Sequence, residues 1–205
     1  MGFALDIDNL ACVRGQRLLF KGLSFRVEEG HALSLEGSNG TGKTSLLRMI
    51  AGFLRPYAGT IHLRTSGKDI VDGEERGGFV GWLGHHDAVK PQMTVAEQIS
   101  FFARLYGGNG DQQAAMERFG ILKLADLPGQ YLSAGQKRRL ALARLSLSTR
   151  PLWLLDEPLA ALDMAGKGLV GEAVAAHCAT GGIVVAATHE ALGIDCERLR
   201  LEPAR

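Results

Sequence analysis

The fold of this chain is decided by the stretch Gly37-Ser38-Asn39-Gly40-Thr41-Gly42-Lys43-Thr44, which fits the pattern G-x-x-x-x-G-K-[ST]. Residues 31–35 before it have the pattern of a short strand, and the apolar residues after it repeat at helical spacing. In such a strand–loop–helix, backbone N–H groups surround phosphate oxygens, the lysine reaches the β- and γ-phosphates, and the threonine hydroxyl binds Mg²⁺. A chance match in a chain of this length has a probability of about one in a hundred. We therefore expect this loop, together with Ser45, to bind phosphate.

Composition excludes several classes of protein. The chain has 205 residues with 23 Lys and Arg against 22 Asp and Glu, so it lacks the basic excess of a dedicated nucleic-acid binder. The longest stretch without these charges, residues 173–189, contains two histidines and is a poor membrane span. No signal peptide is visible at the N-terminus. The three cysteines lack a Cys-x-x-Cys spacing, which predicts reduced thiols rather than a disulfide framework or a zinc site.

Two kinds of periodicity divide the chain. Near the N-terminus apolar residues alternate, as in Phe3, Leu5 and Ile7, which is typical of antiparallel strands joined by a turn. Further along, short apolar strands alternate with helical stretches, and this alternation predicts a parallel sheet in an α/β fold. We expect one domain over residues 1–205. Its core lobe comprises residues 1–83 and 144–205, and a helical subdomain of about residues 84–143 is inserted between them.

Two acidic residues, Asp156 and Glu157, follow a fully apolar strand at residues 152–155. A carboxylate at the end of a buried strand can lie beside the phosphate loop, so we expect Asp156 and Thr44 to hold Mg²⁺. Glu157 is then placed to orient or deprotonate an attacking water. Taken alone, the pair could equally be two surface acids before a turn at Pro158. The phosphate loop argues against that alternative.

Two capping boxes are predicted to begin helices, one at Thr94 and one that contains Ser133, Gly135 and Gln136. A well-capped helix accounts for this motif when it is taken alone. The same geometry directs a helix N-terminus, a hydroxyl and a bare glycine backbone at an anion. The phosphate loop and Asp156 on either side of it in the sequence favour nucleotide binding.

Histidines stand at two further positions of interest. His189 follows a strand at residues 183–187, where it could bridge the γ-phosphate and Glu157, although a lone histidine is more often structural. His85 and His86 are adjacent, so in an extended segment their side chains point in opposite directions and make poor joint metal ligands. Ligand sensing or subunit contact is the better interpretation of that segment.

These motifs, in this order, resemble those of the nucleotide-binding subunit of ABC transporters, and the resemblance covers essentially the whole chain. The most specific element is Leu132-Ser133-Ala134-Gly135-Gln136, which is similar to the ABC signature. The resemblance implies a P-loop NTPase fold with an N-terminal antiparallel β-subdomain and an inserted α-helical subdomain. It also implies ATP hydrolysis with Mg²⁺, in which Glu157 is the base and His189 the switch histidine. Asp163 is similar to the aspartate of the D-loop.

The resemblance also implies partners. In the family, two subunits pair head to tail, so that the phosphate loop of one and the signature serine of the other enclose each ATP. Integral membrane permease subunits dock in the groove between the core and the helical insertion. We therefore expect a second copy of this chain and membrane subunits as partners, no nucleic acid, and a peripheral position on the cytoplasmic face of the bacterial inner membrane.

Within the family the chain is most similar to the ATP-binding subunit of cytochrome c biogenesis systems, the haem exporter ATPase. Its short length and the segment from Gly84-His85 to Lys90 carry this resemblance, with His85 in place of the usual Q-loop glutamine. Arg14 stands where most members place an aromatic ring against adenine, and a guanidinium plane can also stack on a base. Haem would contact this chain only indirectly, through the membrane partners.

Three alternatives remain. The first is another small export ATPase with a peptide or lipid cargo, in which case no haem would accompany the complex. The second is a soluble ABC ATPase of DNA repair or translation, but such proteins carry a long coiled coil or two motif sets, and this chain has neither. The third is a P-loop kinase, against which the signature motif argues.

Overall fold

The chain forms two β-sheets with helices around the second. A computed structural model describes residues 2–108 and 110–202. The antiparallel sheet has the order β2-β1-β4-β5 and the parallel sheet the order β6-β7-β8-β3-β9. The strands are β1 (Ala4–Arg14), β2 (Arg17–Glu28), β3 (Ala32–Glu36), β4 (Ala58–Thr65), β5 (Lys68–Ile70), β6 (Val80–Leu83), β7 (Leu152–Asp156), β8 (Ile183–Ala187) and β9 (Glu197–Arg200).

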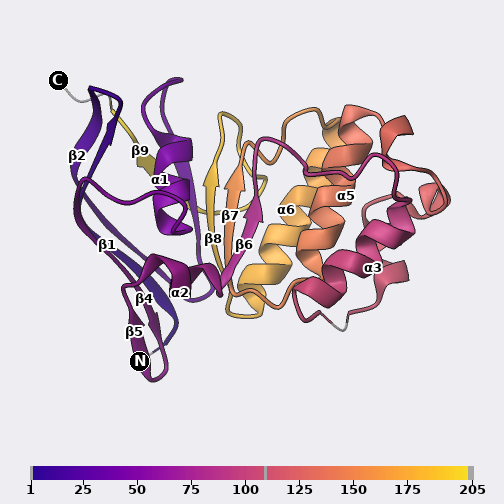
Figure 1. Ribbon diagram of the computed structural model, residues 1–205, viewed down its shortest axis with the longest axis horizontal. Helices are drawn as coiled ribbons and strands as arrows, with labels where there is room; N and C mark the ends of the chain where they lie inside the picture. The colour runs from indigo at the N-terminus through magenta and orange to yellow at the C-terminus, as the bar shows by residue number, and fades with distance from the viewer. Residues whose placement is uncertain (1, 109, 203–205) are drawn as a thin grey trace.

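Helices cover both faces of the parallel sheet. Figure 1 shows α1 and the antiparallel sheet on one side of β6, β7 and β8, and α3, α5 and α6 on the other. The α-helices are α1 (Lys43–Ile50), α2 (Gly73–Gly77), α3 (Val95–Leu105), α4 (Gln112–Arg118), α5 (Ala134–Ser146) and α6 (Met164–Ala179), and two 3₁₀ turns are η1 (Leu122–Leu124) and η2 (Gly129–Tyr131). The predicted α/β fold, with its N-terminal antiparallel sheet, is confirmed.

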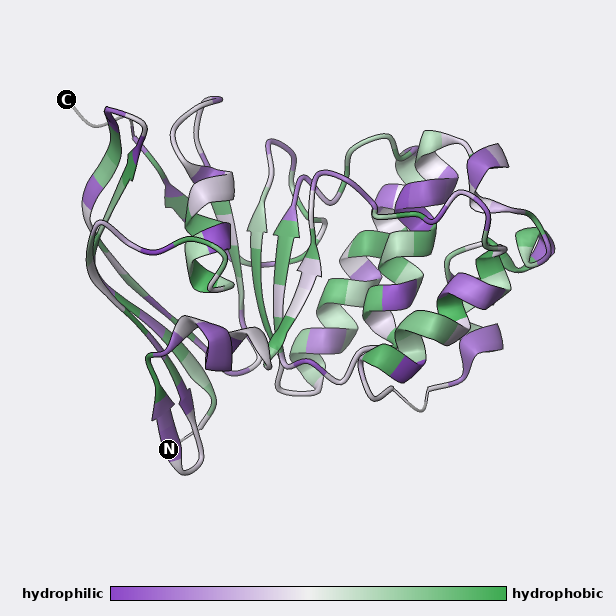
Figure 2. Cartoon of the chain, viewed as in Figure 1, coloured by the Kyte–Doolittle hydropathy of each residue, from purple (hydrophilic) through white to green (hydrophobic). Residues whose placement is uncertain are grey.

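The parallel sheet separates two hydrophobic cores. Strand β7 illustrates this separation, because successive side chains of a strand point to opposite faces of the sheet. Leu152 and Leu154 pack into the core formed with α1 and the antiparallel sheet, whereas Trp153 and Leu155 pack into the core formed with α3, α5 and α6. In Figure 2, β7 and β8 are coloured as hydrophobic over most of their length, as expected of strands buried on both faces.

Sequence patterns located most element boundaries well. The capping boxes predicted at Thr94 and Ser133 are both present, each with reciprocal hydrogen bonds between the N-cap residue and the third helical residue. The short elements β5 and α2 were not predicted. Helix α5 continues past residue 143 to Ser146, so the expected boundary of the helical subdomain falls inside one helix. The division into a core lobe and a helical subdomain remains a proposal.

Candidate nucleotide-binding site

The phosphate loop connects β3 to α1 at the carboxyl edge of the parallel sheet. Three of its glycines adopt positive φ angles that other residues rarely adopt: Gly37 at 144°, Gly40 at 83° and Gly42 at 106°. A Cβ on Gly37 would lie 2.6 Å from the carbonyl oxygen of Leu201, and one on Gly42 would lie 3.0 Å from the ring of Phe20. The loop therefore needs glycine both for its conformation and for the space that it occupies.

Lys43 occupies the inside of this loop. Its side chain is buried, and Nζ donates to the carbonyl oxygens of Gly37 at 2.6 Å and Ser38 at 3.4 Å. Within residues 2–108 and 110–202, no carboxylate forms an ion pair with Lys43. A buried cation without a carboxylate partner is suited to an anionic ligand, because a charge inside a protein is costly without a counter-charge. The loop thus fits a phosphate group.

Thr44 and Asp156 form the candidate metal site. Asp156 ends β7 and is buried, and its Oδ1 accepts a hydrogen bond of 3.0 Å from the hydroxyl of Thr44. A carboxylate and a hydroxyl side by side are the hard oxygen donors that Mg²⁺ prefers. These two residues are 112 positions apart in the sequence, and the sheet brings them together. The donor set fits Mg²⁺.

Glu157 begins the turn after β7 in a conformation that is rare for residues with a side chain. Its φ is 50°, a backbone conformation that costs about 1–3 kcal/mol and persists only when the surroundings enforce it. Its N–H donates to the carbonyl of Ala187 at 2.8 Å. Its Oε1 lies 3.4 Å from Nε2 of His189. The turn therefore directs the carboxylate toward the histidine that follows β8.

One nitrogen of His189 lies among three polar groups. Nε2 is 3.0 Å from Oδ1 of Asn39, 3.3 Å from Nζ of Lys43 and 3.4 Å from Oε1 of Glu157. A protonated Nε2 donates to Asn39 or Glu157, whereas an unprotonated Nε2 accepts from Lys43. The structure therefore brings together the phosphate loop, the end of β7 and His189, which follows β8. Their roles in one nucleotide site stay a prediction.

Ser133 lies in a separate place, at the start of α5. Its hydroxyl accepts from the backbone N–H of Gln136 at 3.3 Å, and Oε1 of Gln136 accepts from the N–H of Ser133 at 2.8 Å. Ser133 is exposed and lines a surface hollow of 380 Å³. The residues lining this hollow are Gly120, Ser133, Gly135, Gln136, Arg139, Ala161, Leu162 and Asp163. Ser133 and Asp163 thus share one open face.

Asp163 is fixed at that face by two donors. It caps α6 by accepting from the backbone N–H of Gly166 at 2.8 Å, and it accepts from Arg139 at 2.6 Å. The bond from Gly166, followed by that from Arg139, holds the pKa of Asp163 below its usual value. Asp163 therefore stays ionised at this face.

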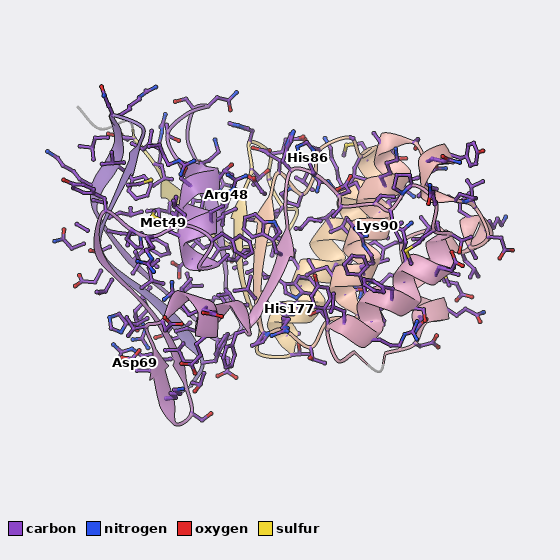
Figure 3. All side chains as sticks on the ribbon, viewed as in Figure 1. Arg48, Met49, Asp69, His86, Lys90 and His177 are labelled. Atoms are coloured by element: carbon purple, nitrogen blue, oxygen red, sulfur yellow. The ribbon has the colours of Figure 1, made fainter. Side chains whose placement is uncertain are left out.

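Arg14 and His85, also predicted as site residues, take no part in the contacts described above. Arg14 ends β1, opposite Arg17 in the hairpin, and is exposed. His85 and His86 lie beyond the end of β6 with their rings edge to face at 5.4 Å, and Figure 3 shows His86 near the carboxyl ends of the parallel strands. The predicted roles of Arg14 and His85 stay predictions. Ser45 lies in the first turn of α1, beside the buried thiol of Cys12, whose pKa is raised by burial.

A buried cluster of charges beside the site was missed by sequence reasoning. Asp87 follows His86 in the loop after β6. From α5, Arg138 lies at ion-pair distance from the Asp87 carboxylate, and Arg144 donates to backbone carbonyl oxygens of the same loop. Burial lowers the pKa of Arg144 to about 10 and raises the pKa of Asp87. The signal available in the sequence was Arg144, a single charged residue within the otherwise apolar run of residues 140–145.

The sequence profile of the ABC transporter family matches residues 20–160. This chain belongs to the ABC transporter family. The ABC ATPase is 47% identical over 196 residues to the cytochrome c biogenesis ATP-binding export protein CcmA of Rhodopseudomonas palustris (strain BisB5), covering 95% of this chain and 96% of that protein. It is 49% identical over 187 residues to the protein of the same name from Paramagnetospirillum magneticum, covering 88% and 85% of the two chains.

Solved structures agree with the fold. A Pyrococcus furiosus protein described as an ABC transporter (ATP-binding protein) superposes with a TM-score of 0.84 at 27% identity and covers 97% of each chain. A bacterial Atm1-family ABC exporter with ATP bound superposes with a TM-score of 0.82 over 98% of this chain and 37% of the exporter, at 24% identity. The expectation of an ATP-binding ATPase that works with membrane partners is confirmed at the level of the family. Among the described residues, no helix is both long and apolar enough to span a bilayer.

Proposed function

We infer that this ABC ATPase is the ATP-hydrolysing subunit of a cytochrome c biogenesis system and couples ATP turnover to the transport or release of haem. The observation that carries this inference is 47% identity over nearly the full length of a protein named for that process. The clustering of the phosphate loop with Asp156, Glu157 and His189 supports it. In this proposal the chain lies peripherally on the cytoplasmic face of the bacterial inner membrane. Haem is handled by its integral membrane partners.

The site supports in-line hydrolysis of the γ-phosphate by water. Lys43 would stabilise the negative charge that develops on the phosphate oxygens. Glu157 would accept the proton of the attacking water, and His189 would orient Glu157 and the γ-phosphate through the contacts of its Nε2. Thr44 and Asp156 would hold Mg²⁺, which supplies charge neutralisation at the β- and γ-phosphates when bound.

The separation of the two nucleotide-binding surfaces supports a dimer. Ser133 and Asp163 line an exposed hollow on the other side of the parallel sheet from α1, so they are free to meet a second molecule. In a head-to-tail pair, the N-terminus of α5 would complete the phosphate site of the other copy. A single copy would then be nearly inactive.

Co-purification tests the assignment. The chain would be expressed together with integral membrane proteins of its own genome, and the complex that it forms with them would be purified. This complex would be assayed for ATP hydrolysis and for a haem absorbance band. We expect both. A complex that hydrolyses ATP but holds peptide or lipid instead of haem would overturn the haem assignment and leave the ATPase in place.

A further inference from the structure

Arg138 is a buried cation that contacts three separate segments around the candidate site. It is 3% exposed. Its NH1 donates to the carbonyl oxygen of Gly84 at 2.9 Å, and its NH2 donates to the carbonyl oxygen of Glu157 at 3.1 Å. NH1 also lies 2.9 Å from Oδ1 of Asp87, as an ion pair without hydrogen-bond alignment. One guanidinium therefore joins α5 to the ends of β6 and β7 and to the loop after β6.

The chemistry of these contacts requires an arginine. Burial lowers the pKa of Arg138, and the nearby carboxylates, with Asp87 the strongest, oppose that effect. A planar guanidinium presents donors in several fixed directions at once, whereas a lysine ammonium is a compact point charge on a flexible stem. Arg138 can therefore bond to Gly84 and Glu157 at the same time, and lysine cannot reproduce that fork.

Glu157 depends on its backbone contacts to direct its carboxylate. Its left-handed conformation is held at the N–H by Ala187 and at the carbonyl by two donors, Arg138 and the N–H of Ala160 at 3.1 Å. Ala160 belongs to the same turn, so among these contacts only Arg138 ties the carbonyl of Glu157 to a helix. Loss of that bond would leave the direction of the Glu157 side chain less constrained.

We propose that Arg138 is a positioning residue for Glu157, which it orients from α5, the helix that begins at Ser133. This rests on the proposed function, since it takes Glu157 as the base. Arg138 lies about one and a half helical turns after Ser133. The helix that would contact the nucleotide of the partner subunit therefore also holds the base of its own site.

Arg144 provides a matched control. It lies on the same helix and is 5% exposed. It donates to the carbonyl oxygens of Ala88 and Asp87 and lies over the ring of Phe102 at 4.4 Å. Its bonds within the described residues go to the loop after β6 and not to Glu157. Substitution of Arg144 therefore disturbs the same loop and the same helix without touching the base.

The first measurement compares Arg138→Lys with Arg144→Lys in the full chain, by kcat and KM for ATP and by thermal unfolding. We expect Arg138→Lys to lower kcat by about ten-fold or more with KM within about two-fold, because a misplaced base slows chemistry and not binding. Arg144→Lys should keep kcat within about two-fold of the wild-type value and should have a Tm similar to that of Arg138→Lys. Equal losses of kcat in both variants would overturn the proposal. If Arg138→Lys does not fold, Arg138→Gln is compared in the same way.

The second measurement is a double-mutant cycle with Glu157→Gln in single-turnover hydrolysis. Residues that act through one another are not additive, so Arg138→Lys should cause no further loss once Glu157 is replaced. Losses that multiply would overturn the proposal while the proposed function stands. A Glu157→Gln variant with wild-type turnover would instead overturn the proposed role of Glu157, and the role of Arg138 with it.

Discussion

At the scale of single residues, the candidate site depends on a few side chains whose partners are far away in the sequence. Nε2 of His189 lies within hydrogen-bond or ion-pair distance of Asn39, Lys43 and Glu157. Such a constellation is expected to lose activity when one member changes, while the fold survives. Two substitutions test this.

Replacement of Glu157 by glutamine removes the proposed base and keeps the shape of the side chain. We expect kcat for ATP hydrolysis to fall by about 10²–10⁴-fold, the typical contribution of a general base, with ATP still bound. Glu190→Gln is the control, since that exposed carboxylate pairs only with Lys167 among the described residues and should leave hydrolysis unchanged. Equal rates for Glu157→Gln and the wild type would exclude the assigned role.

Replacement of Gly42 by alanine tests the phosphate loop. The new Cβ would meet the ring of Phe20 at 3.0 Å with φ at 106°, so the loop must shift, and we expect weaker ATP binding. Gly15→Ala is the control, because Gly15 also has a positive φ but no atom within 4 Å of the added carbon. Binding of a fluorescent ATP analogue measures the difference. Similar affinities for the two variants would contradict the expectation.

At the scale of elements, two helix N-termini have the same cap in different surroundings. Ser133 caps α5 and Thr94 caps α3 through the same reciprocal pattern of bonds. The two caps differ in surroundings, since Ser133 lines the hollow that contains Asp163. Their comparison separates the structural role of a cap from a role in catalysis.

We expect Ser133→Ala and Thr94→Ala each to cost about 1 kcal/mol of stability, equivalent to a fall in Tm of roughly 2–4 °C. Only changes at Ser133 should impair hydrolysis. Ser133→Asp is the sharper variant, because aspartate is as good a cap but places a negative charge against the nucleotide of the partner subunit. It should keep the Tm and lose ATPase activity. Full activity in Ser133→Asp would contradict the proposed contact.

Helix α6 contributes a pH-dependent element of stability. His177 stacks on Trp153 with ring centroids 3.9 Å apart, and its Nε2 lies 3.1 Å from the carbonyl oxygen of Pro151. Burial lowers the pKa of His177 below its ordinary value of 6.5. The unfolded chain therefore binds a proton that the folded chain does not, and stability falls as pH drops through 6.5 toward the folded pKa.

His177→Phe keeps an aromatic ring against Trp153 and removes the titrating group. We expect the free energy of unfolding to fall less steeply between pH 7 and pH 5 in this variant than in the wild type. Denaturant unfolding at a series of pH values measures both slopes. Parallel curves of unfolding free energy against pH would show that burial of neutral His177 does not contribute to the pH dependence of stability.

At the scale of the whole molecule, the two cores share one sheet, so they are expected to unfold together. The phosphate loop leads into α1, whereas the Ser133 hollow is lined by residues of α5 and of the turn before α6. Helices α1 and α5 lie on opposite sides of the parallel sheet (Figure 1). In the proposed head-to-tail pair, the phosphate loop of one copy would face the Ser133 hollow of the other. This geometry supports head-to-tail pairing.

A Glu157→Gln variant should therefore dimerise when ATP is added, because bound ATP is not consumed and holds the two copies together. Light scattering coupled to gel filtration should show the mass of the particle doubling with ATP and Mg²⁺ but not with ADP. Adding Ser133→Asp to this variant should prevent the change. A monomer under all conditions would argue against the paired site.

Features that depend on local chemistry could be predicted from the amino-acid sequence alone. The phosphate loop, the capping boxes at Thr94 and Ser133, and the buried strand before Asp156 rest on bonds or periodicities within a few residues. The family resemblance added the expected roles of Glu157 and His189. These features could be predicted because each local pattern is compatible with few conformations of a short stretch of chain.

Contacts between groups that are distant in the sequence became visible only in the folded molecule. The place of β3 next to β8 in the parallel sheet brings Lys43 beside His189 and Thr44 beside Asp156, and no local pattern in the sequence sets that strand order. The same holds for Arg138, whose sequence neighbours predict an ordinary helix. Its fork to Gly84 and Glu157 exists because α5 packs across the ends of two strands, and a buried charge must find its partners wherever packing brings them.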